Sequence, residues 1–198
     1  MLSLLNELYD GPAAPAVGAF LDAVDSVMNS NTFLLKVRAD VPVTGGDPAE
    51  VLSAFLRDPL FEEMMLAVDR GRGWWNLQDG DGPLVVDGPV RPDVRELGAD
   101  GFWRRLRWML REAFSPYGRR LDDEAAGAVL GPLPEALFGG DEAGWSFCEV
   151  RPDFLRGTGY YSGAACAGLA YFDGGESDTA TFFYRGDVFY LLLTNGSP

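Results

Sequence analysis

The C-terminal third of the chain consists almost entirely of segments typical of β-strands, and this most limits its fold. Four such segments follow one another, at residues 145–150, 164–172, 179–184 and 188–194. The last two flank Arg185-Gly186-Asp187, the composition of a tight turn. We therefore expect an antiparallel meander over residues 144–195, which needs helices or further strands to cover it.

The first two thirds indicate those helices. Apolar residues at helical spacing predict a helix over 17–28, and Asp-Pro sequences at Asp47 and Asp58 are typical helix starts that predict helices 48–57 and 59–69. A longer helix is expected from residue 100 to 114 or 117, followed by a helical or irregular stretch to 137. An apolar period of two predicts a half-buried strand over 32–41, and a glycine-rich acidic turn predicts a hairpin over 73–87.

These segments predict the α+β class in one domain, residues 1–198. Helices mainly within 1–137 should pack on a mostly antiparallel sheet built from 32–41, 73–87 and the meander 144–195. The strands 182–184 and 188–193 are apolar on both faces. Either helices cover both faces, or one face meets another protein, such as a second copy.

The chain contains no histidine, which excludes several site types. It cannot provide a Ser-His-Asp triad, a Cys-His pair or a His-ligated zinc site. Its two cysteines, Cys148 and Cys166, match no metal-binding or disulfide framework, and we expect buried thiols. No apolar run is long enough to span a membrane, and the N-terminus lacks a signal-peptide pattern, so a soluble cytoplasmic protein is expected.

Charge is distributed unevenly along the chain, whose net charge is −14. Residues 91–120 hold eight arginines and four acids, a net charge of +4, which leaves −18 for the rest. On a helical wheel centred on Leu106, the core face includes Phe102, Met109, Phe114 and Tyr117. The predicted binding residues lie away from that face: Arg104, Arg105, Arg107, Trp108 and Arg111.

An outward tryptophan between arginines is typical of a protein-binding hot spot, because both residue types concentrate binding energy. Two other interpretations remain open. Another part of the chain could cover Trp108 while the arginines pair with internal acids, or the surface could stack nucleobases and hold phosphates. The net charge disfavours nucleic acid as a partner.

Glu149 is the best candidate for an unusual carboxyl, since Trp145 and Phe147 share its strand face. Arg151 comes next on that face and should keep Glu149 ionised, which predicts a structural ion pair. The acidic stretches 79–82 and 173–178 fit turns better than metal sites, and 157–163 lacks the lysine of a phosphate loop. We therefore assign no catalytic residue, metal ligand or cofactor.

The sequence favours a non-enzymatic intracellular protein-binding module, an adaptor, inhibitor, immunity or chaperone-like protein with a protein partner or a second copy. Its negative charge suits a basic partner, and the Arg/Trp helix face or the C-terminal hairpin would be the contact. One alternative is a small enzyme or ligand-binding protein whose pocket uses Glu149 with Tyr160 or Tyr161. A second is a nucleic-acid-associated protein that binds locally through residues 104–111.

Overall fold

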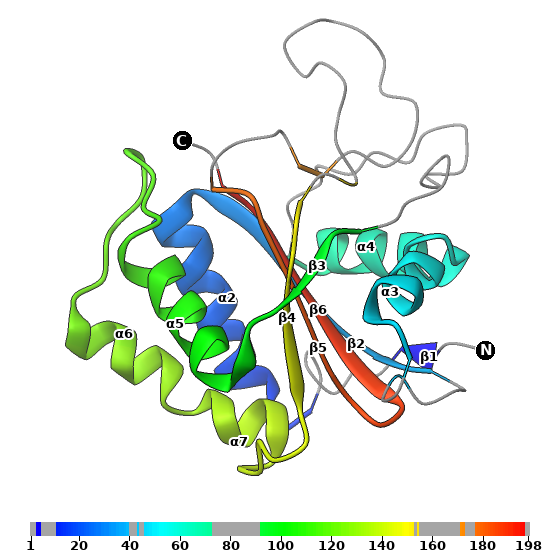
Figure 1. The fold of residues 1–198 in the computed structure, drawn as a ribbon. Helices are drawn as coiled ribbons and strands as arrows, with labels where there is room; N and C mark the ends of the chain where they lie inside the picture. Colours follow the sequence, from blue (N-terminus) through cyan, green and yellow to red (C-terminus); the bar gives the residue numbers. More distant parts are fainter. Residues whose placement is uncertain are drawn as a thin grey trace, which may run out of the picture.

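The computed structural model of the chain describes residues 3–4, 11–39, 43, 46–72, 92–152, 154, 171–172 and 177–196. Within them it confirms the α+β class: helices pack on an antiparallel sheet (Figure 1). The strands are β1 (Ser3–Leu4), β2 (Ser30–Arg38), β3 (Val94–Glu96), β4 (Ser146–Val150), β5 (Thr179–Arg185) and β6 (Val188–Gly196). The predicted hairpin 73–87 and most of the predicted strand 164–172 lie outside the described residues.

The six strands lie in the order β1-β2-β6-β5-β4-β3, and every neighbouring pair is antiparallel. The β5–β6 hairpin therefore lies in the middle of the sheet, and β6 pairs with β2 along its whole length, from Ser30 opposite Gly196 to Arg38 opposite Val188. The predicted turn is confirmed, and Gly186 adopts a φ of 62°, which a glycine tolerates without strain.

Helices cover the sheet on both faces. The helices are α2 (Ala14–Met28), α3 (Pro48–Leu56), α4 (Pro59–Arg72), α5 (Gly98–Arg111), α6 (Asp123–Leu130) and α7 (Leu133–Phe138). Helices α2, α5, α6 and α7 pack on one face, and α3 and α4 on the other (Figure 1). Along β6, Phe189 and Leu191 face α3 and α4, whereas Tyr190 and Leu192 face the other helices. This chain's own helices thus account for the two apolar faces of the hairpin.

Local sequence explains where α3 and α4 begin. The side chain of Asp47 accepts a hydrogen bond from the Ala49 N–H, and that of Asp58 accepts one from the Leu60 N–H. Each aspartate precedes a proline, whose missing N–H costs nothing in a first turn. The two predicted helix starts are therefore confirmed. None of the helices in the described part of the chain is long and apolar enough to cross a lipid bilayer.

The end of α5 differs from the prediction. The helix stops at Arg111, so Phe114 and Tyr117 lie in the loop that follows. They are 50% and 81% exposed, and their assignment to the core face was wrong. Pro116 disfavours helical geometry at Ser115, and the Ser115 N–H instead donates to the carbonyl of Val27 at the end of α2.

Candidate functional site

The predicted binding residues lie on different sides of α5 and do not form one exposed face. Arg105 lies on the flank that faces the sheet, where its side chain is 14% exposed. Its Nη1 donates to Glu149 Oε1 of β4 at 2.6 Å, and its Nη2 donates to the Ala180 carbonyl at 3.4 Å. The expected ion pair of Glu149 therefore exists, but Arg105 forms it instead of Arg151. Arg105 thus joins α5 to the sheet.

Arg107 and Arg111 lie on the opposite flank, beside the start of α6. Arg111 Nη1 donates to Asp123 Oδ1, and Arg107 Nη1 lies 3.9 Å from the same oxygen. The side chain of Arg111 is 27% exposed and that of Arg107 is 53% exposed. The carboxylate of Asp123 thus pairs with both arginines, and of these two Arg107 is the more accessible.

Arg104 lies between the two flanks and is exposed. Its Nε–H donates to the carbonyl of Asp100, one turn earlier in the same helix, at 3.3 Å. No acid in the described part of the chain forms an ion pair with its guanidinium. Arg104 is therefore the predicted arginine best placed to pair with a carboxylate of another molecule.

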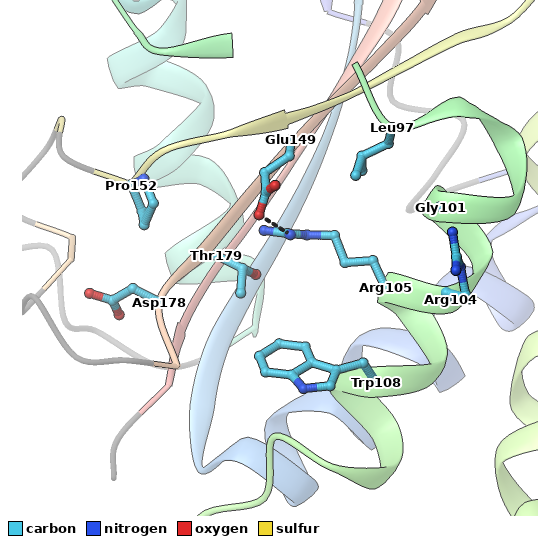
Figure 2. A pocket seen from close by; sticks show the side chains of 9 residues that line it. All are labelled: Leu97, Gly101, Arg104, Arg105, Trp108, Glu149, Pro152, Asp178 and Thr179. Atoms are coloured by element: carbon cyan, nitrogen blue, oxygen red, sulfur yellow. Dashed lines mark hydrogen bonds and ion pairs between the residues drawn. The ribbon is translucent and has the colours of Figure 1, made fainter. Parts of the chain in front are cut away.

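Trp108 is half-buried, which only partly matches the prediction that it points away from the core. It packs against the edge of the apolar cluster that α2, α5, α6 and α7 form on the sheet. Figure 2 shows the indole beside Arg105, on the side of Thr179 of β5. The ring is thus packed in part against this cluster, and part of it remains accessible.

Two open hollows border Arg104. The larger, about 450 Å³, lies between α5 and the sheet (Figure 2). It is lined by Leu97, Gly101, Arg104, Arg105, Trp108, Glu149, Pro152, Asp178 and Thr179. The smaller, about 420 Å³, is lined by Asp100, Trp103, Arg104 and Arg107. At the larger hollow, the Thr179 hydroxyl is buried and has no hydrogen-bond partner among the described residues.

Glu149 is the residue of the predicted enzyme pocket that lines the larger hollow. The carboxylate of Glu149 is held by Arg105, while Tyr160, Tyr161 and residues 79–82 and 157–163 lie outside the described residues. No group of acids and cysteines that could hold a metal ion occurs among the residues the structure describes.

Cys148 is a free, buried thiol on β4, as predicted, whereas Cys166 lies outside the described residues. Burial, with a smaller contribution from the negative charge of Glu96, raises the pKa of the Cys148 thiol from 9.0 to about 11. Because the thiolate is the reactive form, Cys148 is poorly suited to nucleophilic chemistry.

Sequence reasoning missed two features of this region. It missed the Arg105–Glu149 pair, whose members are 44 residues apart in the chain. It also missed the exposure of Phe114 and Tyr117, although Ser115-Pro116 was a usable signal for an early helix end. Comparison of the chain with protein-family models, curated proteins and solved structures gave no match.

Proposed function

We propose that this protein is a non-enzymatic binding module that contacts a partner protein through the outer face of α5. Arg104 receives a carboxylate of the partner, and the accessible part of Trp108 provides a flat apolar contact beside it. Tryptophan and arginine are the residue types in which binding energy concentrates at protein interfaces.

The observation that carries this proposal is the position of Arg104. It is exposed, it borders both hollows, and no acid among the described residues pairs with it. A guanidinium can hold a carboxylate through two parallel hydrogen bonds. The other arginines of α5 are engaged by Glu149 and Asp123, so the helix is fixed on both flanks. A surface that is already ordered loses less entropy on binding.

The charge at Arg104, rather than the net charge of the chain, determines which group of the partner binds there. The chain carries a net charge of −14, which suits a basic partner at long range. At physiological salt, however, exposed charges more than about 8 Å apart are largely screened. Asp100 and Asp178 also line the hollows beside Arg104, so a carboxylate of the partner fits best where it contacts the guanidinium directly.

The same contacts weaken the two alternatives. A nucleic-acid surface needs several free cations for phosphates, yet Arg105 and Arg111 are engaged by acids of this chain. An enzyme would need Glu149 as a general acid or base, but its ion pair with Arg105 occupies one of its two carboxylate oxygens.

The test compares two arginine variants on opposite sides of the sheet. Arg104→Ala removes the proposed contact, and Arg57→Ala removes one exposed positive charge beside α3. Proteins that the immobilised wild type retains from native lysate are identified and purified. Each is then titrated against the wild type, Arg104→Ala and Arg57→Ala. We expect at least one of them to bind Arg104→Ala tenfold more weakly, and Arg57→Ala like the wild type. Equal affinity for both variants would show that α5 is not the contact.

A further inference from the structure

The loop between α5 and α6, residues 112–122, is firmly attached to the rest of the fold. The N–H of Ser115 donates to the carbonyl of Val27, and the N–H of Arg119 donates to that of Ser26. Both carbonyls lie in the last turn of α2, where a helix leaves its carbonyl groups without a partner of its own. Gly118 approaches so closely that a Cβ there would lie 1.9 Å from the Val27 oxygen. The loop therefore presents its side chains from a fixed backbone.

This loop carries two exposed aromatic side chains. Phe114 is 50% and Tyr117 is 81% exposed, and they are the large hydrophobic side chains most exposed in the described part of the chain. The guanidinium of Arg120 lies 5.6 Å from the centre of the Phe114 ring. Exposed aromatic groups on an ordered backbone, next to arginine, are typical of protein interfaces.

The charges around these rings have both signs. Arg119 and Arg120 are exposed, and so are Glu112 at the start of the loop and Glu124 in the first turn of α6. None of the four forms an ion pair with a described residue. A partner of one sign would meet like charges here, whereas a second copy, turned by a two-fold rotation, can place its acids against these arginines.

We propose that this loop surface, residues 112–124, is the interface of a homodimer. Phe114 and Tyr117 from the two copies pack at its centre, and Arg119 and Arg120 of each copy pair with Glu112 and Glu124 of the other. The proposal goes beyond the partner site at Arg104 and does not depend on it. A stable interface buries about 1,200–2,000 Å² in total, so flanking residues of α5 and α6 also take part.

Sedimentation equilibrium of the purified protein, from micromolar to near-millimolar concentration, tests the dimer directly. We expect a concentration-dependent dimer for the wild type and at least tenfold weaker association for Phe114→Ala with Tyr117→Ala. Both side chains are exposed, so at a concentration where the wild type is monomeric this variant should melt at the wild-type temperature. A wild type that stays monomeric throughout, or a dimer that the double variant leaves unchanged, overturns the proposal.

Complementary charge reversals test the pairing itself. One variant carries Arg119→Glu and Arg120→Glu, and the other carries Glu112→Arg and Glu124→Arg. Each alone should dimerise at least tenfold more weakly than the wild type, and an equal mixture should form the heterodimer. The control Arg95→Glu with Arg151→Glu makes the same charge change at exposed positions of β3 and the end of β4, and should dimerise like the wild type. No heterodimer in the mixture, or equal weakening in the control, contradicts the proposed pairing.

Discussion

Arg105 Nη1 lies 2.6 Å from Glu149 Oε1 and ties the middle of α5 to β4. Because Arg105 is largely buried, replacing its partner leaves a guanidinium without a counter-charge. We expect Glu149→Gln to lower the free energy of unfolding by about 1–3 kcal/mol, measured by urea denaturation. In a double-mutant cycle with Arg105→Ala, the two losses should not add. Additive losses would mean that the pair contributes nothing as a pair.

Arg104 and Trp108 should differ in their effect on stability. Arg104 is exposed, so Arg104→Ala should change the free energy of unfolding by less than about 0.5 kcal/mol. Trp108 packs partly on the helix cluster, so Trp108→Ala should lower it by about 1–2 kcal/mol. Thermal or urea unfolding measures both. A large loss for Arg104→Ala would identify that arginine as structural.

Two glycines give opposite predictions for the same substitution. Gly118→Ala places a methyl group against the Val27 backbone and should lower the free energy of unfolding by about 1–3 kcal/mol. Gly127, exposed in α6, has no atom within 4 Å of an added Cβ. Gly127→Ala should therefore raise it by about 0.5–1 kcal/mol. Equal effects in urea unfolding would show that the loop yields at Gly118.

Buried threonine hydroxyls offer a second matched pair. The Thr181 hydroxyl is buried without a hydrogen-bond partner among the described residues, so Thr181→Val should raise the free energy of unfolding by about 1 kcal/mol. The Thr194 hydroxyl donates to Thr32 Oγ1 at 3.3 Å, so Thr194→Val should lower it by about 1 kcal/mol. Chemical denaturation of the two variants gives the sign directly. Destabilisation by Thr181→Val would reveal a hydrogen bond to that hydroxyl.

The Cys148 thiol should be unreactive in the folded protein. With its pKa raised from 9.0 to about 11, the thiolate fraction near pH 8 falls about hundredfold. In a Cys166→Ala background, alkylation should be slow until denaturant is added. The folded state holds this proton more tightly than the unfolded state, so the contribution of Cys148 to stability is lost as the pH rises from about 9 to about 11. Fast labelling without denaturant would place the thiol at the surface.

Local patterns predicted the elements whose causes are local. The Asp-Pro starts of α3 and α4 and the turn at Gly186 depend on neighbouring residues, and all three are confirmed. The strand expected over 32–41 is also present, but as Ser30–Arg38, and it is not half-buried, because Leu34 on its second face is buried as well. The helical wheel of α5 placed Arg104 outward correctly. It was wrong for Phe114 and Tyr117 because a wheel assumes a continuous helix, and this helix ends at Arg111.

Relationships between distant segments were not predictable in the same way. Two arginines could have paired with Glu149: Arg151, two residues later, and Arg105, 44 residues earlier. The ion pair forms with Arg105 because α5 packs over β4. The sequence also left open what covers the two apolar faces of the β5–β6 hairpin. Helices from both sides of the sheet resolve that question, and so the hairpin is not an exposed contact surface.

The central place of β6 has a consequence for synthesis. The Asn31 N–H donates to the Asn195 side chain across 164 positions, and the whole of β2 pairs with β6. During translation, β2 and the apolar sides of α2 and α3 leave the ribosome long before the strand that completes their sheet. The apolar surface of β2, α2 and α3 is therefore exposed to aggregation while the chain is being made. The core can form completely only after the β5–β6 hairpin has emerged and β6 has paired with β2.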